Sequence, residues 1–128
     1  MNKRRLIVAG LCLLATAAPL RAEGDPARGQ RAFQRCYACH SLDPAERNLQ
    51  GPSLDGLFGR RAGTRAGYDY SPAMVAAGRN GLIWTEETLE AFIADPQAVV
   101  PDTNMAPMRM TDPAERADLI AYLKRASR

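Results

Sequence analysis

The segment Cys36-Tyr37-Ala38-Cys39-His40 restricts the possible folds of this chain more than any other feature. In a helical conformation, positions i, i+3 and i+4 lie on one face, so the two thiols and the imidazole point in the same direction. Two thiols at this spacing can bond the vinyl groups of a porphyrin, and the imidazole can bind its iron from the same side. The pattern is typical of covalent haem attachment, with Cys36 and Cys39 as attachment points and His40 as an iron ligand.

Three other uses of two cysteines at this spacing remain as alternatives. A thioredoxin-type redox motif normally follows a strand in an alternating strand and helix pattern, and the sequence shows no such alternation. A structural zinc site normally has four Cys or His ligands, whereas residues 23–128 contain only three such side chains. A structural disulfide would leave His40, the only histidine, without a role. The haem interpretation explains all three side chains.

Residues 1–22 have the pattern of a secretory signal peptide. Residues 1–5 are basic, residues 6–18 form an apolar run, and Leu20, Arg21 and Ala22 resemble a cleavage site. The apolar run has 13 residues, whereas a membrane-spanning helix needs about 20. We expect cleavage after Ala22, a single domain over residues 23–128, and a periplasmic protein without an integral membrane anchor. An uncleaved membrane anchor is the alternative.

The net charge of +3 comes mainly from this leader, which contains four of the 17 basic residues and none of the 14 acidic ones. The remainder has thirteen basic against fourteen acidic side chains. Nucleic-acid binding therefore gains no support from charge. The length of residues 23–128 is enough for one compact domain.

Three capping residues followed by proline predict helix starts at Asp25-Pro26, Ser71-Pro72 and Asp112-Pro113. Glu115 is placed as in a capping box. A fourth helix is predicted to start at Thr85 and to end near Asp95, because Pro96 disfavours helix at the residue before it. Residues 51–67 contain five glycines and little periodicity.

No run of strand length alternates in polarity, so we expect an all-α fold of about four helices. The long loops would be unusual in so small a domain. A buried haem would give these loops an apolar surface on which to pack.

Together with the cysteine motif, several further segments resemble the mitochondrial cytochrome c and bacterial cytochrome c2 family over nearly all of residues 23–128. These segments are Gly51-Pro52-Ser53-Leu54, Gly56-Leu57-Phe58-Gly59-Arg60, Gly67-Tyr68-Asp69-Tyr70, Trp84, Pro101-Asp102-Thr103-Asn104-Met105 and Arg116-Ala117-Asp118-Leu119-Ile120-Ala121-Tyr122-Leu123. The resemblance implies a small cytochrome c fold around one covalent haem c.

The resemblance also implies that Met105 is the second axial ligand of the iron. A thioether opposite an imidazole raises the reduction potential. Met108 and Met110 are close to Met105 in sequence, and spacing alone does not exclude either of them as the second ligand. Alignment favours Met105, leaves Met108 as the alternative, and predicts Met110 as a core residue.

Further roles follow from the same resemblance. The Pro52 carbonyl is expected to accept a hydrogen bond from the ligating imidazole. Arg60, Tyr70 and Trp84 match positions near a haem propionate, and Thr103 matches a hydroxyl in the ligand loop. The crossing of the first and last helices is assigned to Gly29, Phe33, Leu119 and Tyr122.

Three positions depart from the family pattern. Phe92 stands where many relatives have tyrosine, Met74 replaces a common asparagine, and Pro107 replaces an aromatic residue. The first two changes remove polar groups, which predicts a drier haem pocket.

With both axial positions filled, the iron has no open site for substrate, so we expect an electron carrier rather than an enzyme. The expected partners are larger redox proteins, namely a membrane oxidoreductase, a terminal oxidase or reductase, or a periplasmic dehydrogenase. We expect a monomer that binds no nucleic acid. A dedicated haem subunit of a periplasmic dehydrogenase or sulfur-oxidising enzyme is one alternative, and a small peroxidase or ligand sensor is another.

Overall fold

Five helices form the regular structure of the computed structural model, which describes residues 23–46, 49–106 and 108–128. The helices are α1 (Pro26–Tyr37), α2 (Pro72–Arg79), α3 (Glu86–Ala94), α4 (Pro96–Val99) and α5 (Pro113–Ala126). Within these ranges the chain has no strand, and a single isolated bridge joins Arg61 to Ile83. The all-α prediction is confirmed. The predicted signal peptide and Pro107 lie outside the described residues.

The three helix starts predicted from proline are confirmed. The side chains of Asp25, Ser71 and Asp112 each accept backbone N–H bonds from the first turn of the helix that follows. Glu115 differs from the prediction, because its Oε1 accepts a hydrogen bond from Arg35 Nη2 at 2.6 Å. This contact links α5 to α1 instead of closing a capping box.

Helix α4 was not among the predicted helices. Helix α3 ends at Ala94, as expected, and Asp95 then caps the start of α4 with Pro96 at its first position. Asp95-Pro96 is thus the same start signal as the other three pairs. Because Pro96 both ends α3 and begins α4, the described residues contain one short helix in addition to the four that the sequence predicts.

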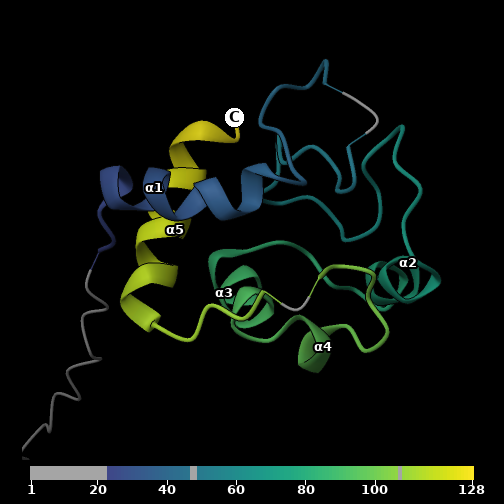
Figure 1. Cartoon of the computed structure of the whole chain (residues 1–128). Coiled ribbons are helices and arrows are strands. Elements are labelled where there is room, and N and C mark those ends of the chain that lie inside the picture. Colours follow the sequence, from purple (N-terminus) through teal and green to yellow (C-terminus); the bar gives the residue numbers. More distant parts are fainter. Residues whose placement is uncertain (1–22, 47–48, 107) are drawn as a thin grey trace, which may run out of the picture.

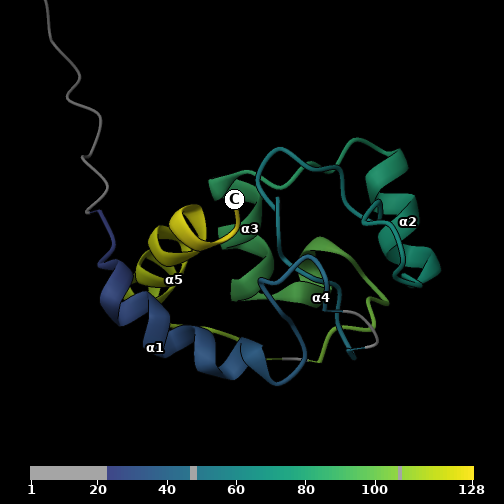
Figure 2. The same ribbon diagram turned by 90° about the horizontal axis from the view of Figure 1, so that it is seen from above.

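Helices α1 and α5 cross closely (Figures 1 and 2), and Gly29 lies at the contact. A Cβ atom at Gly29 would lie 1.9 Å from the carbonyl oxygen of Asp118, so only glycine permits this approach. The rings of Phe33 and Tyr122 pack beside it with centroids 5.5 Å apart. The predicted crossing of the first and last helices is confirmed.

Much of the apolar core surrounds a cavity. Helices α1, α2, α3 and α5 and the loops between them all contribute to its wall. The buried hydrophobic residues that line it are Leu57, Met74, Trp84, Leu89, Phe92, Ile93, Leu119 and Leu123. None of the helices in the described part of the chain is long and apolar enough to cross a membrane.

Candidate cofactor site

The cavity has a volume of about 300 Å³, within the range of small-molecule and cofactor sites. Its wall is mostly apolar and includes every residue that the sequence singled out for the site. These residues are Cys36, Cys39, His40, Pro52, Arg60, Tyr70, Trp84, Thr103 and Met105. The fold thus collects side chains from positions 36 to 105 around one space.

The two cysteines enter the cavity from the end of α1. The helix ends at Tyr37, but the backbone N–H groups of Cys39 and His40 both bond the carbonyl of Cys36, at 3.0 and 2.9 Å. This last turn keeps the i, i+3 and i+4 positions on one side. Both thiols are free, and burial raises the pKa of the Cys36 thiol to about 11.

His40 is held in one tautomer by the chain. Its Nδ1 lies 2.8 Å from the carbonyl oxygen of Pro52. Because a carbonyl can only accept, Nδ1 must carry the proton, which leaves the Nε2 lone pair free to bind a metal. Burial lowers the pKa of His40, and the hydrogen bond to Pro52 offsets part of this effect. Burial therefore favours the neutral imidazole, which is the form that binds a metal.

Gly51 allows the loop to approach the His40 ring. A Cβ atom at Gly51 would lie 2.5 Å from His40 Cε1. The same residue donates its backbone N–H to the Cys39 carbonyl at 2.8 Å. A larger residue at position 51 would displace the imidazole from the Pro52 carbonyl.

Three methionines follow α4, and the structure separates one of them from the others. Met110 is 5% exposed and lies in the core, as predicted. Its backbone N–H bonds the carbonyl of Ile93. Met105 is half-buried and Met108 is 40% exposed, and both line the cavity. Met105 as the second ligand remains a prediction.

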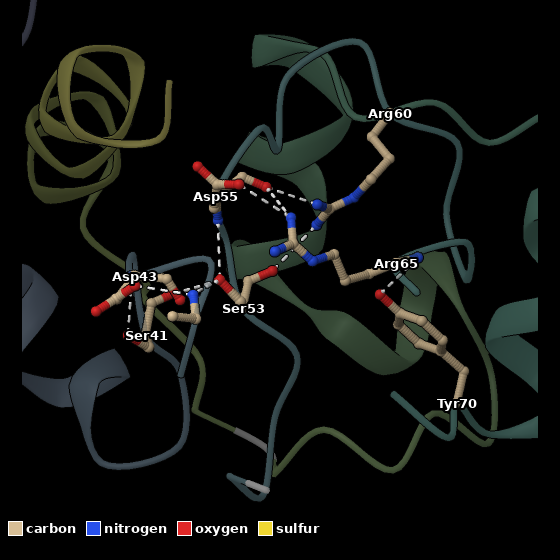
Figure 3. A network of polar contacts seen from close by, with 8 residues as sticks. Ser41, Asp43, Ser53, Asp55, Arg60, Arg65 and Tyr70 are labelled. Atoms are coloured by element: carbon tan, nitrogen blue, oxygen red, sulfur yellow. Dashed lines mark hydrogen bonds and ion pairs between the residues drawn. The ribbon is translucent and has the colours of Figure 1, made fainter. Parts of the chain in front are cut away.

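Arg60, Tyr70 and Trp84 form a polar part of the cavity wall (Figure 3 shows the first two). Backbone bonds in both directions between the segments around Arg60 and Trp84 hold these side chains together. Arg60 donates from Nη1 to the Asp55 carbonyl at 2.7 Å and from Nη2 to the Ser53 carbonyl at 3.3 Å. Desolvation by burial lowers the pKa of Arg60 and raises the pKa of Tyr70.

Two further residues of this wall carry donor groups, namely the indole N–H of the buried Trp84 and the hydroxyl of Tyr70. The Tyr70 oxygen accepts the backbone N–H of Arg65 at 3.3 Å, which leaves its proton to donate elsewhere. Together with the Arg60 guanidinium, these donors suit a ligand that carries acceptor oxygens.

The family model for Cytochrome c matches residues 26–127. The chain belongs to the cytochrome c family. It is 42% identical to cytochrome c2 from Blastochloris viridis over 94% of this chain and 92% of that protein. It is 45% identical to cytochrome c2 from Agrobacterium tumefaciens over 79% of this chain and 91% of that protein.

A solved structure of cytochrome c2 from Rhodospirillum centenum has the same fold as this cytochrome. Its TM-score is 0.76 at 39% identity, and the match covers 82% of this chain and all of that one. Cytochrome cH from Methylobacterium extorquens gives a TM-score of 0.72 at 41% identity. The prediction of a small cytochrome c fold is confirmed.

The cofactor of this cytochrome family is one covalent c-type haem with its iron, and the residues present fit that group. The cavity is mainly apolar. Two free thiols and a neutral imidazole are grouped at the end of α1. The arginine and the N–H and O–H donors of the polar wall suit carboxylates. Each chemical part of the haem has matching groups in the wall.

Two of the departures from the family pattern lie in this cavity. Met74 and Phe92 are both buried and line the wall, so the expected loss of polar groups falls inside the pocket. Pro107, the third, lies outside the described residues.

Three residues that the sequence did not single out for the site lie outside the cavity lining and contact the segments that form it. Asp55 and Arg65 contact the Arg60 and Tyr70 segments, and Gln97 contacts the segment before Met105. A long-range ion pair has no sequence pattern that would reveal it. Gln97 follows the Asp95-Pro96 start signal directly, so recognition of α4 would have drawn attention to it.

Proposed function

We propose that this cytochrome carries single electrons between larger redox proteins, with His40 and Met105 as the two axial ligands of its haem iron. The observation that supports this best is that Cys36, Cys39, His40 and Met105 all line one cavity. A thioether paired with an imidazole favours reduced iron and raises the potential. Filling both positions leaves no coordination site for a substrate.

The bound haem supplies the one-electron redox chemistry, and the chain's residues fix its surroundings. Cys36 and Cys39 provide the two covalent attachment points. The Pro52 carbonyl orients His40 and keeps its proton on Nδ1. Arg60, Tyr70 and Trp84 offer donors to the propionates, and the buried apolar residues exclude water.

We also propose that residues 1–22 direct export and that the mature protein works in the periplasm. The partners would be a membrane oxidoreductase, a terminal oxidase or reductase, or a periplasmic dehydrogenase. The names of the relatives, cytochrome c2 in bacterial species, support this placement. A redox titration of purified holoprotein, followed by tests of which membrane fractions reduce and oxidise it, examines the carrier function directly.

The ligand assignment is tested with Met105→Ala and Met108→Ala in the haem-containing protein. Met105→Ala is expected to lose the thioether-to-iron absorption band and to bind carbon monoxide rapidly when reduced. Met108→Ala is expected to keep the band and to bind carbon monoxide no faster than the wild type. The reverse result would assign Met108 as the ligand. A wild-type protein that acquires no covalent haem, under conditions where other c-type cytochromes mature, would contradict the whole proposal.

A further inference from the structure

Asp55 and Arg65 form an ion pair directly behind the polar wall of the cavity. Arg65 Nη1 lies 3.0 Å from the Asp55 carbonyl oxygen and 3.1 Å from Asp55 Oδ2. The two side chains are 21% and 22% exposed. Lys124 and Glu86, in contrast, form a pair in which each side chain is about half exposed. The Asp55–Arg65 pair is therefore less screened by water than a surface pair.

This ion pair contacts two residues that line the cavity, Arg60 and Tyr70. The Asp55 carbonyl accepts from Arg65 and also from Arg60 Nη1, so two guanidinium groups converge on one backbone oxygen (Figure 3). The backbone N–H of Arg65 donates to the hydroxyl of Tyr70. Arg60 and Tyr70 line the cavity, whereas Arg65 does not. Arg65 thus acts on the wall without being part of it.

Hydrogen bonds of the Ser53 hydroxyl to backbone groups fix the position of Asp55. The buried Ser53 directs its hydroxyl at the carbonyl of Asp43 at 3.2 Å, and the backbone N–H of Asp55 donates to the Ser53 hydroxyl at 3.3 Å (Figure 3). Ser53 directly follows Pro52, whose carbonyl orients His40. The segment that positions the imidazole therefore also carries the carboxylate of the pair.

Two positive charges and one negative charge lie close together around the Asp55 carbonyl oxygen. Arg60 and Arg65 bring two positive charges to one oxygen, and Asp55 provides the one carboxylate that pairs with Arg65 there. Desolvation lowers the pKa of Arg60, and the charge of Arg65 acts in the same direction. Removing the carboxylate would leave two poorly hydrated cations beside the wall. Removing Arg65 would leave the Asp55 carboxylate without its ion-pair partner.

We propose that Asp55 and Arg65 are positioning residues whose ion pair sets the net charge at the polar wall and thereby the reduction potential of the haem. The inference rests on the proposed electron-transfer function. Added positive charge near the iron favours its reduced form, and added negative charge favours its oxidised form. Opposite changes to the two partners should therefore shift the potential in opposite directions.

The test is a spectroelectrochemical titration of the holoprotein variants Asp55→Asn, Arg65→Gln and the double variant. Asp55→Asn is expected to raise the midpoint potential and Arg65→Gln to lower it. The double variant is expected to return close to the wild-type value. Glu86→Gln and Lys124→Gln change the net charge by the same amounts in the exposed pair, and are expected to shift the potential less.

Arg65→Lys distinguishes charge from shape. One nitrogen of Arg65 makes both contacts to Asp55, so a lysine can replace it and is expected to keep the wild-type potential. A shift as large as that of Arg65→Gln would overturn the inference, because geometry and not charge would then be responsible. This variant also provides the test if Asp55→Asn does not retain haem.

Shifts of the midpoint potential in the same direction for Asp55→Asn and Arg65→Gln would also overturn the inference. Such a result is expected if each substitution merely loosens the polar wall, because loosening would change the potential of both variants in the same way. Shifts no larger than those of the exposed pair would do the same. Failure of the wild type to attach haem or to show a reversible one-electron wave would instead refute the proposed function. The two failures are therefore distinguishable.

Discussion

The carboxylate of Asp118 accepts three hydrogen bonds where α5 meets α1. Its Oδ1 accepts the backbone N–H of Asp25 at 2.6 Å and Arg28 Nη2 at 3.0 Å, and its Oδ2 accepts Arg28 Nε at 2.7 Å. The side chain is 8% exposed, whereas that of Arg28 is 56% exposed. The hydrogen bonds from Arg28, together with that from Asp25, hold the pKa of Asp118 below its ordinary value.

This lowered pKa predicts the effect of acid. A carboxyl whose pKa is lower in the folded state stabilises the fold fully above its unfolded pKa, about 3.9. That stabilisation disappears as the pH falls through the folded value. Asp118→Asn is therefore expected to lower stability at pH 7, and its difference from the wild type is expected to shrink below about pH 4.

Denaturant unfolding of the holoprotein at pH 7 and pH 3 measures this difference. Asp69→Asn, at an exposed aspartate, is the matched control and is expected to change little at either pH. A deficit of Asp118→Asn that stays the same at both pH values would show that the shape of the side chain, and not its charge, stabilises the crossing.

At the scale of elements, the short helix α4 holds the loop that leads to Met105. Gln97 Oε1 accepts the backbone N–H of Asp102, and its Nε2 donates to the carbonyl of Thr103, both at 3.0 Å. Asp102 has φ of 65°, in the left-handed region that non-glycine residues seldom adopt. Gln97 therefore stabilises a loop conformation that the backbone alone does not favour.

Gln97→Ala is expected to make the ligand loop easier to open. Each lost hydrogen bond contributes about 1 kcal/mol, and about 1.4 kcal/mol corresponds to a tenfold change in an equilibrium constant. Two such bonds are lost, so we expect the affinity of the oxidised holoprotein for added imidazole, which would compete with the proposed ligand Met105 for the iron, to rise about 30-fold.

A spectroscopic imidazole titration measures this affinity. Gln97→Glu keeps the acceptor for Asp102 but loses the donor to Thr103, so an intermediate affinity is expected. Gln30→Ala removes an exposed glutamine from α1 and should match the wild type. An unchanged affinity in Gln97→Ala would mean that α4 does not restrain the loop.

For the whole molecule, the main feature is that the core is arranged around a cavity of about 300 Å³. Without the cofactor, the apolar side chains that line it would lack packing partners on the cavity side and would face water. A typical domain is stable by only about 5–15 kcal/mol, so the loss of these contacts would remove much of the stability. Folding of this chain should therefore depend on the cofactor, whose binding favours the native state.

The double variant Cys36→Ala/Cys39→Ala, prepared without haem, is expected to lose most of its helical circular dichroism. Addition of haem is expected to restore part of it, since His40 and the apolar wall remain. Wild-type holoprotein with the same tag and purification is the control. Native-level helicity in the haem-free double variant would show that the helices pair stably around an empty cavity.

Local patterns made the helix starts and the attachment motif predictable. A capping side chain acts on N–H groups two or three residues away, and Cys36, Cys39 and His40 lie within a single turn. Helix α4 was missed because proline both ends one helix and begins another, and the sequence does not say which applies. Met110 in the core was predicted from alignment, and burial confirms it.

The sequence by itself determined the haem-binding motif, the helix starts and the family, because each of these depends on neighbouring residues or on an ordered series of motifs. Only the tertiary structure brought Asp55 and Arg65 behind Arg60, and placed Gln97 against Asp102 and Thr103. It also showed that Met105 and Met108 line the same cavity. Such contacts depend on how the loops fold back on one another, and residue spacing carries no information about that geometry.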